Sequence, residues 1–173
     1  MGTLLERDSE LARLRQLLDA ARIGQGRVAF VSGEPGIGKT TLVNAFASTI
    51  AGEARVAFGR CDALLTPRAL GPLLDIATSL GVAGANDRDA LLTDLVVDIR
   101  AHDATVLIIE DAQWADDASI DLLVMLGRRV ADLPLLLIVT YRDDEVTREH
   151  PFRLAVGDLI TASSTVWLGL RPL

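Results

Sequence analysis

Cysteine, aromatic residues and positive charge are all scarce in this sequence of 173 residues. The single cysteine, Cys61, excludes the internal disulfide framework on which small secreted domains typically depend. The N-terminus also lacks the basic and then apolar pattern of a signal peptide. A reducing, cytoplasmic setting is therefore predicted.

Acidic residues outnumber basic ones by 24 to 17, which gives a formal net charge of -7, and lysine and arginine form no cluster. Such a chain has no row of cations to neutralise phosphates, so we expect no direct nucleic-acid binding by this segment. The longest apolar runs, such as residues 133–140, are far shorter than the roughly 20 residues that span a bilayer. No membrane partner is expected, and these runs are typical of buried strands.

Only 4% of the residues are aromatic although half are hydrophobic, so aliphatic side chains must build the core. Short apolar and β-branched runs predict strands near residues 27–32, 55–59, 105–109, 135–140 and 165–168, with helical periodicity between most of them. Buried strands that alternate with helices indicate a three-layer α/β fold around a mostly parallel five-stranded sheet. The length favours one domain, residues 1–173.

Residues 33–40 read GEPGIGKT and match the phosphate-loop pattern G-x-x-x-x-G-K-[ST] between a predicted strand and a predicted helix. The glycines let successive backbone N–H groups point at phosphate oxygens, and the helix N-terminus adds partial positive charge. Lys39 supplies an ammonium for the outer phosphates, and the Thr40 hydroxyl is placed to bind Mg²⁺. The predicted nucleotide-binding residues here are Gly33, Glu34, Pro35, Gly36, Ile37, Gly38, Lys39, Thr40 and Thr41.

Glu110 and Asp111 follow the apolar run 105–109, at the sheet edge where α/β proteins bind ligands. One carboxylate can hold Mg²⁺ together with Thr40, and the other can polarise the water that attacks the γ-phosphate. An ordinary strand exit is the alternative interpretation of this pair, but the upstream phosphate loop favours the metal site. Glu110, Asp111 and Lys39 are therefore candidate catalytic residues.

Arg142 ends the strand predicted at residues 135–140 and is a fourth candidate catalytic residue. A neighbouring parallel strand would bring it to the same site, where a guanidinium can sense the γ-phosphate. The alternative is a surface arginine that pairs with the acidic residues 143–145.

Taken together, "SGEPGIGKTTLV", "LIIEDAQWAD" and "TYRDDE" resemble the Walker A, Walker B and sensor segments of the signal-transduction ATPases with numerous domains (STAND), a branch of the AAA+-like P-loop proteins. The chain looks most similar to the ATPase module of large LuxR-type transcriptional regulators. In that family the opening segment, here "LLERDSELARL", lies near the adenine, which implies base contacts by Leu4, Leu5 and Arg7. Glu6 stands where the family usually has glycine. The order of Glu110 and Asp111 leaves their separate roles open.

This resemblance implies a switch that binds ATP or ADP and regulates a larger signalling or transcriptional protein, with slow Mg²⁺-dependent hydrolysis. Family members continue into a lid, sensor and DNA-binding domains, so the chain resembles an excised nucleotide-binding core with near-background turnover. Nucleotide-dependent self-association is a further implication. An assembly module that binds without hydrolysis and a small-molecule kinase are the alternatives, although no arginine-rich lid of a kinase is recognisable.

Overall fold

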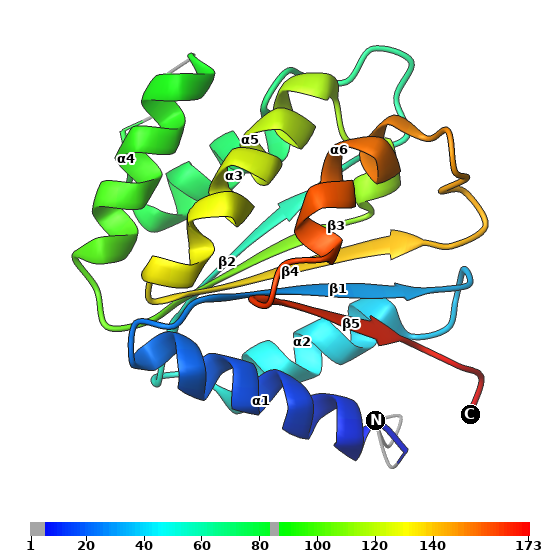
Figure 1. Ribbon diagram of the computed structural model, residues 1–173, viewed down its shortest axis with the longest axis horizontal. Coiled ribbons are helices and arrows are strands. Elements are labelled where there is room, and N and C mark those ends of the chain that lie inside the picture. Colours follow the sequence, from blue (N-terminus) through cyan, green and yellow to red (C-terminus); the bar gives the residue numbers. More distant parts are fainter. Residues whose placement is uncertain (1–5, 84–86) are drawn as a thin grey trace.

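Five parallel strands form one sheet at the centre of the computed structural model, which describes residues 6–83 and 87–173 (Figure 1). The order across the sheet is β2-β3-β4-β1-β5. Their bounds are β1 Arg27–Gly33, β2 Arg55–Arg60, β3 Thr105–Glu110, β4 Leu135–Arg142 and β5 Thr165–Gly169. The predicted three-layer α/β fold is confirmed, and the sheet is parallel throughout the described residues rather than mostly parallel.

The central strands β3 and β4 are buried along almost their whole length, which explains why they have apolar residues at both odd and even positions. Because all five strands run the same way, their carboxyl ends meet at one edge of the sheet. The register there pairs Gly33 of β1 with Arg142 of β4, and Arg60 of β2 with Glu110 of β3. Residues far apart in sequence are thus brought together at this edge.

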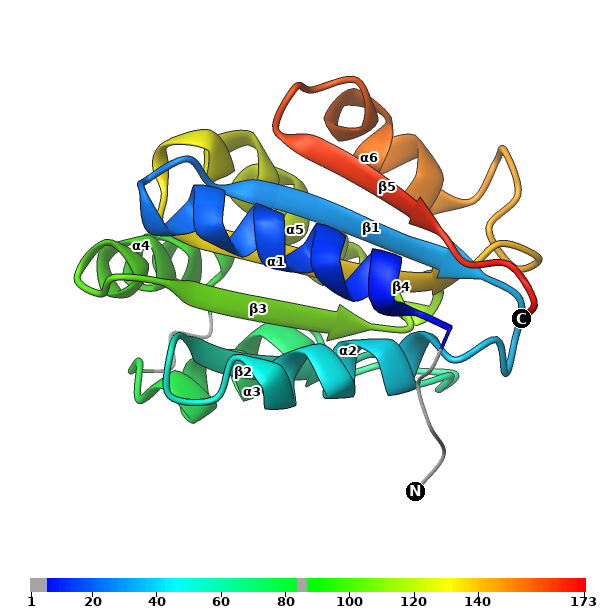
Figure 2. The ribbon, with the colours of Figure 1, turned by 90° about the horizontal axis from the view of Figure 1, so that it is seen from below.

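Helices cover both faces of the sheet (Figure 2). One face packs against α1 (Asp8–Arg22) and α2 (Lys39–Thr49), and the opposite face packs against α3 (Gly71–Leu80), α4 (Arg88–Arg100), α5 (Asp117–Arg129) and α6 (Pro151–Ile160). Alternate residues of β1 serve the two layers, since Ala29 and Val31 join the core under α1 and α2 whereas Val28 and Phe30 join the other core. Two single-turn helices, η1 (Ala112–Trp114) and η2 (Val130–Asp132), precede and follow α5.

The sequence patterns did not predict α6. Its signals are present but short: His150 caps the helix, Pro151 occupies the first turn, and the buried Phe152, Val156 and Leu159 keep helical spacing. It packs closely on α5, where a Cβ at Gly127 would come within 2.7 Å of Leu159 Cδ1. Over the described residues, no helix is both long and apolar enough to cross a membrane.

Candidate functional site

The loop between β1 and α2 has a backbone that only glycine adopts easily. Gly36 and Gly38 have φ angles of +77° and +102°, in the left-handed region. A Cβ at either position would meet no other atom within 4 Å, so the glycines serve the backbone conformation and leave open space in front of the loop. Gly38 is also the N-cap of α2 and gives its first turn no side-chain partner. The free N–H groups of that turn suit an anion such as phosphate.

Lys39 lies inside this loop with only 7% of its surface exposed. Its ammonium donates hydrogen bonds to the carbonyl oxygens of Gly33, at 2.7 Å, and Glu34, at 2.9 Å. Burial lowers the pKa of the Lys39 ammonium, and the charge of Arg142 lowers it further. The loop carbonyls thus hold the Lys39 ammonium within the loop, where its positive charge favours binding of an anionic ligand.

Thr40 connects the loop to the acidic end of β3. Its hydroxyl donates a 2.8 Å hydrogen bond to Oε1 of Glu110, the last residue of that strand. Glu110 is buried, with 7% of its surface exposed. Thr40 and the acidic strand end therefore meet through Glu110, and Mg²⁺ binding by these residues stays a prediction.

Asp111 follows in a left-handed conformation, with φ of +57°. This turn directs its backbone N–H to the hydroxyl oxygen of Thr140 in β4, at 3.1 Å. Its carboxylate lies 3.9 Å from Nε of Arg60. The two acidic residues thus have different surroundings, because Glu110 faces the loop hydroxyl whereas Asp111 faces an arginine.

An open pocket of about 240 Å³ lies at this edge of the sheet. It is lined by Gly36, Gly38, Lys39, Thr40, Thr41, Arg60, Asp111 and Arg142. All of these except Arg60 were predicted from the sequence. Arg60 belongs to no sequence motif. It reaches the pocket because β2 pairs with β3, which places Arg60 beside Glu110.

Arg142 combines both interpretations that its sequence position allowed. It lines the phosphate-loop pocket, and its Nη1 also donates a 2.8 Å hydrogen bond to Oε1 of Glu145. The guanidinium carbon lies 4.6 Å from the centre of the Trp114 ring, which is a cation–π contact. The backbone N–H of Arg142 is fixed by the side chain of Gln113.

Arg7, expected beside an adenine, is buried against the back of the loop. Its guanidinium donates hydrogen bonds to the carbonyl oxygens of Ile37, at 3.3 Å, and Arg171, at 2.7 Å, and pairs with Glu10. These contacts engage the side chain within the protein, and base contact by Arg7 stays a prediction. The predicted contacts of Leu4 and Leu5 lie outside the described residues.

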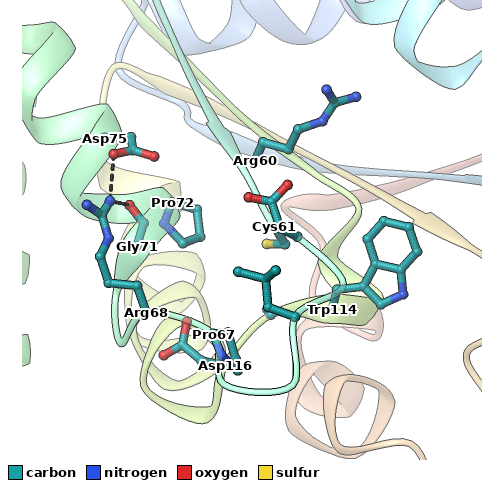
Figure 3. A pocket seen from close by; sticks show the side chains of 12 residues that line it. Arg60, Cys61, Pro67, Arg68, Gly71, Pro72, Asp75, Trp114 and Asp116 are labelled. Atoms are coloured by element: carbon teal, nitrogen blue, oxygen red, sulfur yellow. Dashed lines mark hydrogen bonds and ion pairs between the residues drawn. The ribbon is translucent and has the colours of Figure 1, made fainter.

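A second cavity, of about 230 Å³, borders the first beyond the end of β2 (Figure 3). Arg68, bound to Asp75 and the Gly71 carbonyl, lies on one side of it, and Trp114 lies on the other. Burial raises the pKa of the Cys61 thiol in its wall to about 12, so the thiol is not a nucleophile at neutral pH. Arg60 lines both cavities.

The donors present fit Mg²⁺ bound together with a phosphate ligand. Within the described ranges, no three His, Cys, Asp or Glu side chains gather into a metal cage. Mg²⁺ commonly keeps several waters and takes one or two carboxylates plus substrate phosphates. The Thr40 hydroxyl and the Glu110 carboxylate, with Asp111 nearby, are donors of that kind.

Comparisons with known proteins identify the family and the fold. A family model described as "AAA ATPase domain" matches residues 3–139. An uncharacterized protein of Rhizobium meliloti (strain 1021) is 27% identical over 212 residues, a match that covers 91% of this chain and 21% of that protein. The chain therefore spans about a fifth of the length of this relative.

Solved structures share the fold at low sequence identity. Cdc6p from Pyrobaculum aerophilum has a TM-score of 0.66 and 20% identity, over 97% of this chain and 46% of that one. A chain in the structure of Drosophila ORC bound to DNA has a TM-score of 0.68 and 16% identity, over 96% of this chain and 43% of that one. Both matches cover nearly the whole chain and support the fold alone.

Proposed function

Because the chain belongs to the AAA ATPase domain family, we propose that it binds ATP and ADP with Mg²⁺ and works as a nucleotide-dependent switch. The observation that carries this proposal is the contact between Thr40 and Glu110, which joins the phosphate loop to the acidic strand end. A merely structural glycine turn would not require a hydroxyl and a buried carboxylate to meet in front of it.

The loop N–H groups and Lys39 hold the phosphates in this proposal. A bound phosphate offers Lys39 a charged partner in place of the Gly33 and Glu34 carbonyls. Thr40 and Glu110 would hold Mg²⁺, which would supply positive charge to offset that of the outer phosphates. The open side of the pocket leaves room for the rest of the nucleotide.

Hydrolysis of ATP to ADP and phosphate requires a water molecule aligned with the terminal phosphorus. Asp111 lines the pocket without contacting Thr40, and we assign it the role of orienting that water and accepting its proton. Arg142, at the same pocket, offsets charge on the leaving and transferred groups. We expect slow turnover. Phosphoryl transfer is accelerated when protein groups surround the charge on the transferred phosphate, and this open pocket leaves that charge exposed to water.

The switch is proposed to serve a larger regulator of the STAND class, of the LuxR type. Support comes from the sequence segments that resemble that class and from a relative about five times as long as the matching part. Nucleotide-dependent self-association and contacts with lid, sensor and DNA-binding domains belong to the same proposal. The net charge of -7 argues against direct DNA binding by this chain, although the Drosophila ORC structure is of a complex bound to DNA.

The first test is Lys39→Ala, read by calorimetric titration with Mg-ATP and Mg-ADP. Lys39 is the single lysine in the sequence, so no other ammonium side chain can replace it. We expect binding to fall at least about 100-fold, while circular dichroism shows a folded chain. Arg100→Ala removes one exposed cation at the end of α4, which leads into the amino end of β3, opposite the pocket, and this variant should bind as the parent does. Unchanged binding in a folded Lys39→Ala chain would exclude this loop as the nucleotide site.

Binding without turnover is the second candidate function, in which the chain is an assembly module. The position of Asp111 favours hydrolysis over this alternative, since Asp111 lines the pocket and its carboxylate is not needed for binding alone. Phosphate release by the parent chain and by variants of the acidic pair distinguishes the two.

A further inference from the structure

Three side chains beside the phosphate-loop pocket form a closed set of contacts. Glu145 accepts a hydrogen bond from Arg142 through Oε1 and another from Nε1 of Trp114 through Oε2, both at 2.8 Å. The guanidinium of Arg142 also lies over the Trp114 ring. Glu145 and Trp114 together are called the holding site for Arg142 below.

The holding site has the chemistry of a competitor for phosphate. A carboxylate and a phosphate both bind guanidinium through paired oxygens, so Glu145 and a phosphate group seek the same face of Arg142. Roughly a third of each side chain in the Arg142–Glu145 pair is exposed, which keeps this ion pair weak. A dianionic terminal phosphate in the adjoining pocket can therefore displace Glu145.

We infer that Glu145 and Trp114 are positioning residues that hold the Arg142 guanidinium at the wall of the phosphate-loop pocket until a bound triphosphate draws it further in. This inference rests on the proposed function and extends it to the discrimination of ATP from ADP. The terminal phosphate of ATP draws Arg142 off the holding site, whereas ADP lacks that group and leaves Arg142 on Glu145. The holding site thus lowers the affinity for ATP and not that for ADP.

The movement of Arg142 from Glu145 to the terminal phosphate would change the surroundings of Trp114. Its ring forms part of the wall of the second cavity, on the side opposite Arg68 (Figure 3). When Arg142 leaves, the ring loses the cation above it and Glu145 loses one of its two donors. The local surroundings of Trp114 therefore depend on whether ATP or ADP is bound.

The first experiment measures the dissociation constants of a non-hydrolysable ATP analogue and of ADP, both with Mg²⁺. Glu145→Gln removes the charge that competes for Arg142 and keeps an oxygen for the Trp114 N–H. We expect the analogue to bind about two- to fivefold more tightly and ADP to bind as before. Glu149→Gln is the matched control, because it removes one exposed charge from the same acidic loop.

A double-variant cycle then assigns the effect to Arg142. Arg142→Gln should weaken the analogue more than ADP, and adding Glu145→Gln to it should change nothing further. If Glu145→Gln tightens the analogue equally with and without Arg142, the effect is general electrostatics and the inference is overturned.

The second experiment uses fluorescence. The chain has two tryptophans, and Trp167→Phe leaves Trp114 as the single reporter. We expect the ATP analogue to change Trp114 emission and ADP to change it much less, with the difference lost in Arg142→Gln. Equal responses to both nucleotides would contradict the exchange.

These outcomes are separable from failure of the proposed function. One outcome is that Lys39→Ala abolishes binding while neither the affinities of Glu145→Gln nor the Trp114 fluorescence distinguishes the ATP analogue from ADP. That result would support the nucleotide site and contradict the holding site. If Lys39→Ala binds normally, the proposed site itself is wrong.

Discussion

At the scale of single residues, the backbone between Glu110 and Asp111 separates two carboxylates that the sequence presents as equivalent. Asp111 adopts a left-handed conformation, lines the pocket, and has its carboxylate 3.9 Å from Nε of Arg60. Glu110 stays in the strand and contacts Thr40. Resemblance left the assignment of metal and water roles open, whereas these contacts favour Glu110 for Mg²⁺ and Asp111 for water.

This assignment predicts different losses from the two amide substitutions. Glu110→Gln should make nucleotide binding less dependent on Mg²⁺ and also slow turnover. Asp111→Asn should bind Mg-ATP almost as the parent does and lose turnover by about 100-fold, or down to background. Magnesium titrations followed calorimetrically, together with phosphate release, provide both measurements.

Asparagine is well suited to this test because it tolerates the left-handed backbone that Asp111 adopts. Asp103→Asn, at an exposed position before β3, makes the same chemical change away from the pocket and is the control. Swapped outcomes, with binding lost in Asp111→Asn and turnover alone lost in Glu110→Gln, would reverse the assignment.

At the scale of elements, Asp116 joins the start of α5 to the segment that precedes α3. Its Oδ2 accepts hydrogen bonds from the backbone N–H groups of Ser119 and Leu70, both at 3.1 Å. The first contact caps α5, and the second fixes Leu70, which has a left-handed φ of +59°. One carboxylate therefore organises the wall of the second cavity.

We expect Asp116→Ala to reduce the free energy of unfolding by about 1–2 kcal/mol, because the N–H groups of α5 and Leu70 lose their acceptor. Urea denaturation monitored by circular dichroism measures this change. Asp117→Ala, one residue further on, removes the same charge without a capping bond and should cost less than about 1 kcal/mol. Equal losses in the two variants would assign the effect to charge at the helix terminus.

The strands found from sequence are those with short apolar, β-branched or aromatic runs. All five strands were predicted within two residues of their ends: β3 and β4 are buried and apolar almost throughout, and the partly exposed β2 and β5 are short runs rich in β-branched and aromatic residues. The phosphate loop was found because its chemistry demands a fixed spacing of glycine, lysine and threonine. The helix α6 was missed because ten residues with only three buried positions give little periodicity.

The parts of the site that sequence did not reveal depend on strand order. Arg60 reaches the pocket because β2 pairs with β3, and Glu145 meets Trp114 because the end of β4 lies beside η1. Neither residue belongs to a local motif. Contacts between elements that are distant in the chain follow from packing of the whole sheet, so a one-dimensional pattern cannot predict them.

At the scale of the whole molecule, ligand binding and folding are coupled through mass action. Nucleotide that binds the native chain at about 100 times its dissociation constant should raise the free energy of unfolding by roughly 2.7 kcal/mol. Thermal or urea unfolding with and without Mg-ADP checks this value. Lys39→Ala should lose the increment while keeping its own ligand-free stability close to that of the parent, and an increment that persists there would indicate binding elsewhere.

The two backbone hydrogen bonds of Arg7 couple separate parts of the chain. Its guanidinium binds the carbonyl oxygen of Ile37 in the phosphate loop and that of Arg171 near the other end of the described chain. The guanidinium thus links the residue just before α1 and the segment after β5 to one peptide group of the phosphate loop. A shift of the Ile37 carbonyl within this loop would move the guanidinium that also binds Arg171, so the shape of the loop and the position of the segment after β5 are coupled through a single side chain.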